Sequence, residues 1–229
     1  MSIIKTQDLT KIYVDHTVEV HALNGVTLDV AEGEFTAVVG PSGSGKTTFL
    51  NIVGGLDNPS SGTVSIGDTD ITDLKDNELI DFRLNNIGFV FQAYNLIPVL
   101  TAKENVEFIM LMQKKSKKER DSRVEELLVA VGLGDQMNKK PREMSGGQQQ
   151  RVAVARALAS KPKFVLADEP TANLDSKTAI NLLEIMANLN KEEGITFIFS
   201  THDQKVIDRA RRIVTLEDGK IVSDVEQNV

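Results

Sequence analysis

One glycine-rich loop constrains this chain more than any other feature. Residues 40–47, Gly-Pro-Ser-Gly-Ser-Gly-Lys-Thr, match the pattern G-x-x-x-x-G-K-[ST] at every fixed position. They follow the apolar stretch 35–39, which predicts a short buried strand, and precede residues 48–53, which predict the start of a helix. A strand, a glycine loop and a helix in that order are the context in which this pattern binds phosphate. The sequence therefore predicts a phosphate site, with a strand-to-helix turn that binds nothing as the alternative.

The residue types in the loop suit phosphate chemistry. Glycine takes the backbone angles that let successive N–H groups point at one anion, and the helix that follows adds the positive end of its dipole. The side chain of Lys46 can reach the β- and γ-phosphates of a nucleotide, and the hydroxyl of Thr47 can ligate Mg²⁺. The residues expected to bind the nucleotide here are Gly40, Ser42, Gly43, Ser44, Gly45, Lys46, Thr47 and Thr48.

The composition narrows the class of protein. With 229 residues, 41% of them hydrophobic, the chain can form one large domain with a full core. A net charge of −7 argues against a dedicated nucleic-acid surface. The chain has no cysteine, which excludes disulfides and thiolate metal sites. No secretory leader or run of 18 apolar residues is visible, so we expect no direct insertion into a bilayer.

Two carboxylates follow another apolar stretch. Residues 163–167 predict a strand that ends at Asp168 and Glu169. They lie far from Lys46 along the chain, but the carboxyl ends of parallel strands meet at one crevice. An Asp there can hold Mg²⁺ directly or through water, and a second carboxylate can take a proton from an attacking water. The alternative is a helix cap or turn acid before Pro170.

Three further residues are candidates for the same crevice. Gln92 follows a strand predicted over residues 87–91, and its amide oxygen can contact a metal ion or a water. His202 follows a strand predicted over residues 195–200, and its ring can hydrogen-bond a γ-phosphate, although a lone histidine is more often structural. Tyr13 lies in the N-terminal strands, where it offers a flat surface for adenine or is an ordinary strand aromatic.

A second glycine-containing sequence, Ser-Gly-Gly-Gln at 145–148, precedes a predicted helix. Ser145 and Gln148 form an S-x-x-Q capping box, which is a sufficient structural reason for both. The box leaves Gly146 and Gly147 unexplained, because glycine lowers helix propensity. A bare backbone at a helix N-terminus lets an anion approach closely. The sequence therefore predicts a second phosphate-binding element, which has no lysine of its own.

The remaining segments complete an α/β pattern. Residues 3–30 predict paired strands with turns at Asp15-His16-Thr17 and Asn24-Gly25, and the chain closes with a hairpin around Asp218-Gly219. Helices are predicted over 102–112, 118–131 and 176–189, and from Gln149 to about Ser160. The basic run 114–118 is either a solvated loop or a contact with anionic lipid. The apolar stretch 96–100 is either capped core or a docking surface.

The motifs follow one another as the phosphate loop, Gln92, Ser145-Gly146-Gly147-Gln148, Asp168-Glu169, Asn173-Leu174-Asp175 and His202. In this combination the chain resembles the ATP-binding cassette subunits of ABC transporters over essentially its whole length. Residues 88–92, 96–102 and 168–175 are similar to the LolD/MacB/FtsE branch, which works in lipoprotein release, export and cell division. The chain departs from the family at Met144, where Leu is usual and close in volume, and from the branch at Ala172, where Gly is frequent.

The resemblance implies roles for individual residues. Tyr13 would stack on adenine, and the loop with Lys46 would bind the phosphates. Thr47 and Asp168 would coordinate Mg²⁺, and Gln92 would contact both the metal and the attacking water. Glu169 would be the general base and His202 the γ-phosphate sensor, and the nucleotide of another subunit would be contacted by Ser145, Gly146, Gly147 and Gln148. Because that last contact comes from another copy, the resemblance implies a head-to-tail homodimer that binds two ATP.

The expected fold is an α/β P-loop NTPase domain of the ABC type over residues 1–229. Its core is expected to be a mostly parallel sheet with an N-terminal antiparallel β layer and an inserted α-helical subdomain. The domain has a core lobe at about 1–92 and 160–229 and a helical lobe at about 93–159. The expected function is ATP hydrolysis that drives a separate transmembrane ABC permease, which would place the chain in the cytoplasm, peripheral on the inner membrane face. The alternatives are a cell-division type ATPase that regulates a membrane partner without transport, and a soluble ABC ATPase; no nucleic-acid partner is expected.

Overall fold

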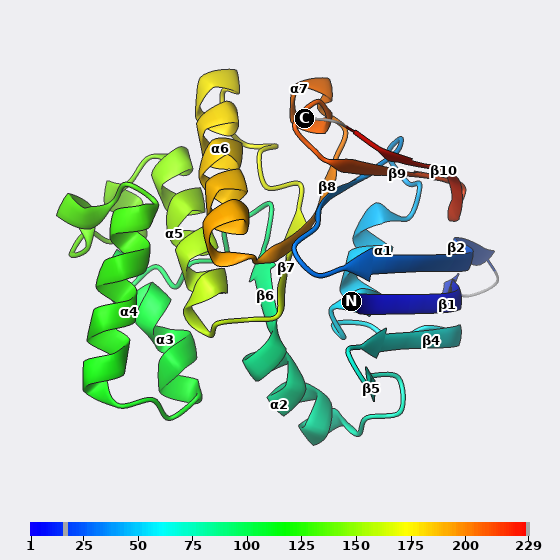
Figure 1. Cartoon of the computed structure of the whole chain (residues 1–229), viewed down its shortest axis with the longest axis horizontal. Coiled ribbons are helices and arrows are strands. Elements are labelled where there is room, and N and C mark those ends of the chain that lie inside the picture. Colours follow the sequence, from blue (N-terminus) through cyan, green and yellow to red (C-terminus); the bar gives the residue numbers. More distant parts are fainter. Residues whose placement is uncertain (16–17, 228–229) are drawn as a thin grey trace.

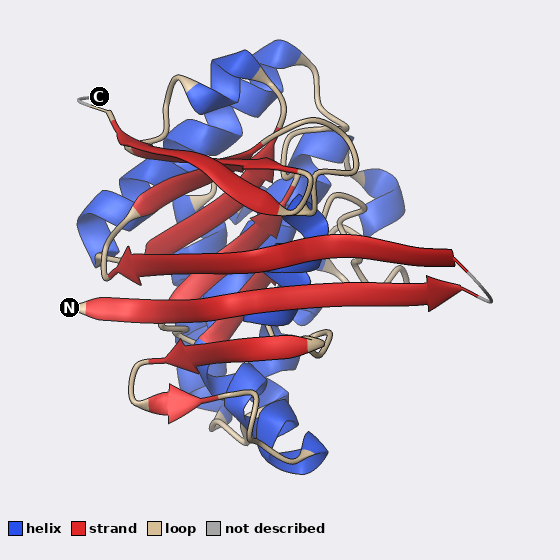
Figure 2. Cartoon of the chain, turned by 90° about the vertical axis from the view of Figure 1, so that its right-hand side faces the viewer, coloured by secondary structure: helices blue, strands red, loops and turns tan. Residues whose placement is uncertain are grey.

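The computed structural model describes residues 1–15 and 18–227, which form two β-sheets with helices packed around them (Figure 1). The first sheet is antiparallel, with strand order β2-β1-β4-β5. Its strands are β1 (Ser2–Asp15), β2 (Val18–Ala31), β4 (Ser61–Ile66) and β5 (Thr69–Asp70). The long hairpin of β1 and β2 lies across the strands of the second sheet (Figure 2).

The second sheet has strand order β10-β9-β3-β8-β7-β6 and is mostly parallel. Its strands are β3 (Phe35–Val39), β6 (Ile87–Val90), β7 (Phe164–Asp168), β8 (Thr196–Thr201), β9 (Arg212–Glu217) and β10 (Lys220–Glu226). Only β10 runs antiparallel to its neighbour, as the second half of the predicted closing hairpin.

The helices lie on both sides of this second sheet. They are α1 (Lys46–Val53), α2 (Asp76–Asn86), α3 (Ala102–Met112), α4 (Lys117–Ala130), α5 (Gly146–Ala159), α6 (Ser176–Glu193) and α7 (Gln204–Ile207), with short 3₁₀ turns η1 (Gly134–Gln136) and η2 (Pro141–Glu143). None of the helices within the described ranges is both long and apolar enough to cross a membrane.

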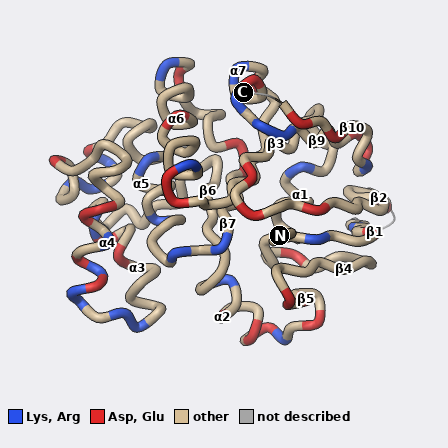
Figure 3. The backbone as a smooth tube through the Cα atoms, in the orientation of Figure 1, with Lys and Arg blue, Asp and Glu red and all other residues tan. Residues whose placement is uncertain are grey.

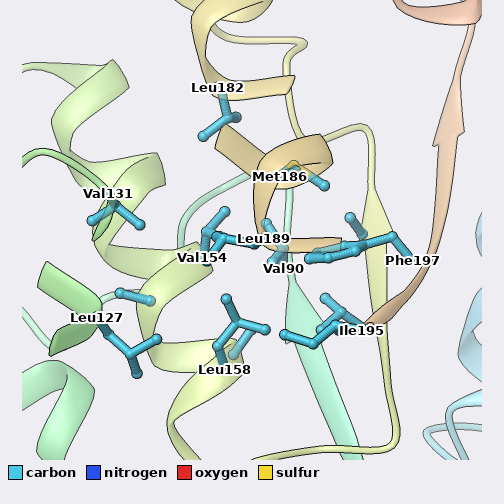
Figure 4. Close-up of a cluster of buried hydrophobic side chains, with 14 of the residues drawn as sticks. Val90, Leu127, Val131, Val154, Leu158, Leu182, Met186, Leu189, Ile195 and Phe197 are labelled. Atoms are coloured by element: carbon cyan, nitrogen blue, oxygen red, sulfur yellow. The ribbon is translucent and has the colours of Figure 1, made fainter. Parts of the chain in front are cut away.

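The central strands are apolar without interruption because both faces of the sheet are buried. Every residue of β3 and β8 is buried, and alternate side chains enter opposite cores. Phe197 faces a core formed with α3 to α6, part of which is shown in Figure 4. Its neighbour Ile198 faces a core shared with α1 and the first sheet. The cores fix the sheet between α3 to α6 on one side and α1 with the long hairpin on the other.

The parallel register brings several strand ends to one edge. Val39, the last residue of β3, is paired with Thr201, the last residue of β8. Asp168 at the end of β7 is paired with Ser200, and Val90 at the end of β6 with Ala167. Polar residues that follow these strands therefore start from neighbouring points, as predicted for the crevice.

Two local predictions are wrong. Asn24-Gly25 is not a turn, because β2 continues through it; Gly25 has φ +74° at a place where the pairing with β1 shifts register. Asn24 instead donates to the carbonyl of Asp218 at 2.7 Å, which joins the two hairpins. The helix predicted from Gln149 begins earlier, at Gly146, directly after its cap.

Three further sequence predictions concern the first hairpin, the lobe boundaries and the basic run. The predicted turn at 15–17 falls partly on residues 16–17, outside the described ranges. The lobe boundaries near residues 93 and 159 stay a prediction, although α3, α4 and α5 contribute to one core. The basic run 114–118 lies at the turn between α3 and α4 (Figure 3), and Lys117 pairs there with Asp121.

Candidate functional site

A groove of about 630 Å³ gathers most of the predicted site residues. It is lined by Tyr13, Val20, His21, Ala22, Ser42, Gly43, Ser44, Gly45, Lys46, Thr47, Thr48, Gln92, Glu169 and His202. The hairpin residues 20–22 were not foreseen, because nothing in their sequence indicates that the long hairpin folds over the loop. Residues 145–148 are absent from this lining, so within the described part of one chain they do not join the groove.

Two positions of the phosphate loop require glycine, for two separate reasons. Gly40 has φ +151° and Gly45 has φ +101°, which side chains rarely tolerate. A Cβ on Gly40 would also lie 2.1 Å from the carbonyl oxygen of Leu216, and one on Gly45 would lie 2.3 Å from that of Ala22. Neighbouring backbone therefore packs against the loop so closely that glycine is required at both positions.

Lys46 brings a buried positive charge to the loop. Its residue is only 8% exposed, and its Nζ donates to the carbonyls of Gly40 at 2.8 Å and Pro41 at 2.9 Å. Both partners are neutral, and within residues 1–15 and 18–227 no carboxylate pairs with this ammonium group. A buried cation without a counter-charge favours an anion beside it.

A chain of hydrogen bonds joins the loop to the two carboxylates. The hydroxyl of Thr47 donates to Oδ1 of Asp168 at 3.1 Å. The hydroxyl of Ser200 donates to the same oxygen at 2.6 Å and accepts from the backbone N–H of Glu169 at 2.9 Å. Ser200 is fully buried and was not predicted, because its sequence context is only that of a strand end.

Glu169 is held in an unusual backbone conformation. Its φ is +46°, in the left-handed region that disfavours side chains, and such strain is concentrated at functional sites. Its Oε1 lies 2.8 Å from Nδ1 of His202. The side chain of His202 is 69% exposed, whereas that of Glu169 is only 15% exposed. The strained backbone and the imidazole together direct the carboxylate into the groove.

Side-chain amides tie Gln92 to its surroundings. Asn173 donates from Nδ2 to the carbonyl of Gln92 at 2.9 Å. Gln150, fully buried on α5, donates from Nε2 to the carbonyl of Pro170 at 2.8 Å and more weakly to that of Phe91. The segment with Gln92, the segment after Glu169 and α5 are therefore fastened to one another. Gln150 was missed because a polar residue inside a helix gives no sign of its burial.

The predicted capping box at the start of α5 is present. Ser145 Oγ accepts from the backbone of Gln148, whose side chain accepts from the backbone of Ser145. The glycines have close neighbours that were not foreseen: a Cβ on Gly146 would lie 2.7 Å from the hydroxyl of Tyr94, and one on Gly147 would lie 2.2 Å from Cγ2 of Thr178. Packing within one chain therefore accounts for Gly147 without an anion, whereas the atom next to Gly146 is the far end of a side chain that can move away. The side chain of Ser145 remains exposed.

Tyr13 projects from the hairpin into the groove. The residue is 40% exposed, and its hydroxyl donates to Oδ2 of Asp57 at 2.7 Å. The phosphate loop and an aromatic ring thus line one groove, an arrangement that suits a nucleotide with its phosphates on the loop and its base on the ring.

The oxygen atoms near the phosphate loop suit a metal ion that is also held by phosphate. The described ranges contain no cluster of three or more acidic, histidine or cysteine side chains that could hold a metal by themselves. Mg²⁺ is commonly held by one or two carboxylates together with the phosphates of its substrate. Asp168 and Thr47 present oxygen ligands at the foot of the loop, which is the donor chemistry that this ion prefers.

The sequence of this chain is similar to those of known ATP-binding proteins, which agrees with a nucleotide site in the groove. Residues 23–172 match the family model described as ABC transporter. The lipoprotein-releasing system ATP-binding protein LolD of Geobacter metallireducens is 45% identical over 97% of this chain and 99% of its own length. The macrolide export ATP-binding/permease protein MacB of Mannheimia succiniciproducens is 42% identical over all of this chain and 35% of its own length.

A solved structure extends the comparison to the whole fold. The dimeric, post-hydrolysis structure of the ATP-binding cassette MJ0796 bound to ADP and Pi, from Methanocaldococcus jannaschii, superposes with a TM-score of 0.91 at 44% identity, covering 99% of both chains. The predicted fold class, a mostly parallel core with an antiparallel N-terminal sheet and inserted helices, is thereby confirmed. The chain belongs to the ABC transporter family of ATP-binding proteins.

Proposed function

We propose that this chain hydrolyses ATP in the presence of Mg²⁺ and that hydrolysis drives a membrane-spanning partner. The observation that carries the proposal is the hydrogen-bonded series from Thr47 through Asp168 and Ser200 to Glu169 and His202, which begins at the phosphate loop. A phosphate-binding loop, an oxygen ligand set and a carboxylate base are the parts that hydrolysis of a nucleoside triphosphate needs.

Glu169 is the general base in this proposal. Its carboxylate faces the groove and takes a proton from the water that attacks the γ-phosphate. His202, 2.8 Å from that carboxylate, holds it in place and reaches toward the γ-phosphate. Gln92 lies in the same groove, where its side chain contacts the attacking water.

Thr47 and Asp168 are the protein ligands for Mg²⁺, with Gln92 as a third contact. When bound, the ion neutralises charge on the phosphates and orients them. Lys46 reaches the same phosphates from within the loop, after giving up its bonds to the carbonyls of Gly40 and Pro41.

Two copies of the chain complete each site. Ser145 is exposed and lies outside the groove of its own chain, so its capping hydroxyl and the start of α5 are free to contact the γ-phosphate bound by another copy. The dimeric MJ0796 cassette is a precedent for such an assembly. ATP then closes a head-to-tail dimer around two nucleotides, and hydrolysis lets the copies part.

The membrane partner is a permease subunit of the ABC class. MacB carries ATP-binding and permease functions under one name, and this chain matches about a third of its length. Acting with a permease, the chain would work in the cytoplasm at the inner face of the membrane. Co-purification with a membrane subunit from detergent would support this arrangement, and recovery of the chain alone would favour a soluble ATPase.

The test of the catalytic assignment is Glu169→Gln, which keeps the shape of the side chain and removes its basicity. Loss of a general base typically lowers turnover by about 10²- to 10⁴-fold. We expect that loss in kcat with nucleotide binding retained. Glu192→Gln, on the exposed face of α6, is the matched control and should leave turnover unchanged. Near wild-type turnover in Glu169→Gln would show that the base is another group.

A further inference from the structure

Three side chains next to the groove form a closed set of contacts. Lys11 and Tyr13 are two residues apart on β1 and therefore point to the same face of the strand. Asp57 lies in the loop that follows α1, and its two carboxylate oxygens have different partners. Oδ1 accepts from Nζ of Lys11 at 2.7 Å, and Oδ2 accepts from the hydroxyl of Tyr13 at 2.7 Å. Both ends of the carboxylate are thus used to fix residues of β1.

Lys11 also acts on the aromatic ring itself. Its Nζ lies 4.8 Å from the centroid of the Tyr13 ring, within the range of a cation–π contact. The same ammonium group donates to the carbonyl of Asn58 at 2.6 Å, so both this carbonyl and the Asp57 carboxylate fix its position. The ring of Tyr13 is therefore held in position by Lys11 and Asp57 before any ligand stacks on it.

The contacts are shielded enough to hold the ring. The side chain of Lys11 is 12% exposed and that of Asp57 is 30% exposed, unlike a freely solvated surface ion pair. Burial and the bond to Asp57 raise the pKa of Tyr13. Burial opposes ionisation of Asp57, but hydrogen bonds from Lys11 and Tyr13 outweigh it and lower the pKa of that carboxyl. At neutral pH Asp57 is an ionised acceptor and Tyr13 a neutral donor.

Asp57 belongs to the same structural unit as the phosphate loop. Helix α1 begins at Lys46, and the backbone N–H of Asp57 bonds to the carbonyl of Asn51 within that helix. The contact with Tyr13 therefore connects the ring to the helix whose first residues form the phosphate loop. This link sets the position of the ring relative to the loop.

We propose that Asp57, together with Lys11, is a positioning residue that holds the ring of Tyr13 as a preformed platform for the adenine base. The inference rests on the proposed ATP site and adds residues that do not themselves touch the nucleotide. A platform fixed before binding spares the ligand the cost of ordering it. Its loss is expected to weaken ATP binding by about 3- to 10-fold without changing the chemical step.

Other bonds attach β1 to the loop after α1, so we expect Asp57→Ala to keep the strand docked. The backbone N–H of Ser60 donates to the carbonyl of Thr10 at 2.8 Å, and the hydroxyl of Ser60 accepts from the N–H of Ile12 at 3.0 Å. These bonds attach the strand to the loop after α1 independently of the carboxylate.

The experiment compares ATP with inorganic tripolyphosphate, which has phosphates but no base. In Asp57→Ala and Tyr13→Phe we expect KM for ATP to rise by about 3- to 10-fold, kcat to stay unchanged, and the inhibition constant of tripolyphosphate to stay unchanged. The double variant should be no worse than Asp57→Ala alone, because Asp57→Ala already removes the one contact that Tyr13→Phe removes. Asp68→Ala, at an exposed turn, is the matched control.

The outcomes separate this inference from the proposed function. Tyr13→Ala removes the platform altogether and should raise KM for ATP more than either variant above. If Tyr13→Ala weakens ATP while Asp57→Ala and Tyr13→Phe behave like wild type, the positioning role is refuted and the ATP site stands. If Asp57→Ala weakens tripolyphosphate as much as ATP, Asp57 is merely structural and the inference fails. If Tyr13→Ala leaves KM unchanged, the stacking role in the proposed function fails as well.

Discussion

The hydroxyl of Ser200 lies 2.6 Å from Oδ1 of Asp168, across two paired strands. The hydroxyl oxygen of Ser200 also accepts a hydrogen bond from the backbone N–H of Glu169. Among the described hydrogen bonds, this oxygen is the one atom that contacts both the proposed metal ligand and the proposed base. One buried hydroxyl therefore sets the direction of the Asp168 carboxylate and supports the strained backbone of Glu169.

Ser200→Ala should lower kcat for ATP hydrolysis by about 10- to 100-fold, since a hydrogen bond to a charged group contributes about 1.5–3 kcal/mol. We also expect a higher Mg²⁺ concentration for half-maximal activity, because Asp168 loses the donor that orients it. Both values follow from ATPase assays over a Mg²⁺ series. Ser223→Ala, on exposed β10, is the control; equal kinetics in the two variants would contradict the role of Ser200.

Gly147→Ala should destabilise the chain by about 1–3 kcal/mol, because the new methyl group would lie 2.2 Å from Cγ2 of Thr178. Thr178→Ser deletes that methyl group and keeps the hydroxyl that donates to Asp175. The double variant Gly147→Ala/Thr178→Ser should therefore recover most of the loss. Urea unfolding of the four proteins measures this coupling, and additive effects would rule out the steric explanation.

The sequence could predict features whose signal is local. The phosphate loop, the capping box at Ser145 and the helix at 102–112 follow from neighbouring residues. The meeting of Gln92, Glu169 and His202 follows from a parallel sheet alone. These predictions needed no knowledge of which distant side chains touch.

Contacts between distant segments could not be predicted. Ser200, Gln150 and Asp57 act through partners from 20 to 59 positions away, and nothing near them in sequence marks those partners. The same limit explains Gly147 of α5, whose constraint comes from Thr178. The turn predicted at Asn24-Gly25 was wrong because this dipeptide, although typical of hairpin turns, has another use here. It permits an irregular pairing inside one long strand.

Asp121→Asn should lower stability at neutral pH and lose that effect in acid. Hydrogen bonds from Lys117 and then Lys103 lower the pKa of Asp121 from 3.8 to about 2. Because the folded-state pKa is lowered, the carboxylate contributes its full stabilisation above about pH 4, and the contribution is lost as the pH falls toward 2.

Melting temperatures of wild type and Asp121→Asn between pH 7 and pH 2.5 test this sign. The gap between them should be constant from pH 7 to about 4 and should narrow below that. Asp135→Asn is an exposed control on η1 and should show no such trend. A gap that widens in acid would mean that the lysines do not stabilise the folded state through Asp121.

The central claim, that a second copy completes each ATP site, is tested most directly by the mass of Glu169→Gln in solution. Sedimentation equilibrium with saturating ATP and Mg²⁺ should give twice the 25.1 kDa of one chain, and 25.1 kDa without nucleotide. Adding Ser145→Arg to that variant should return it to the monomer, because the added side chain blocks the contact with the other copy's nucleotide. A species that stays at 25.1 kDa with ATP, or a dimer indifferent to Ser145→Arg, would contradict the account.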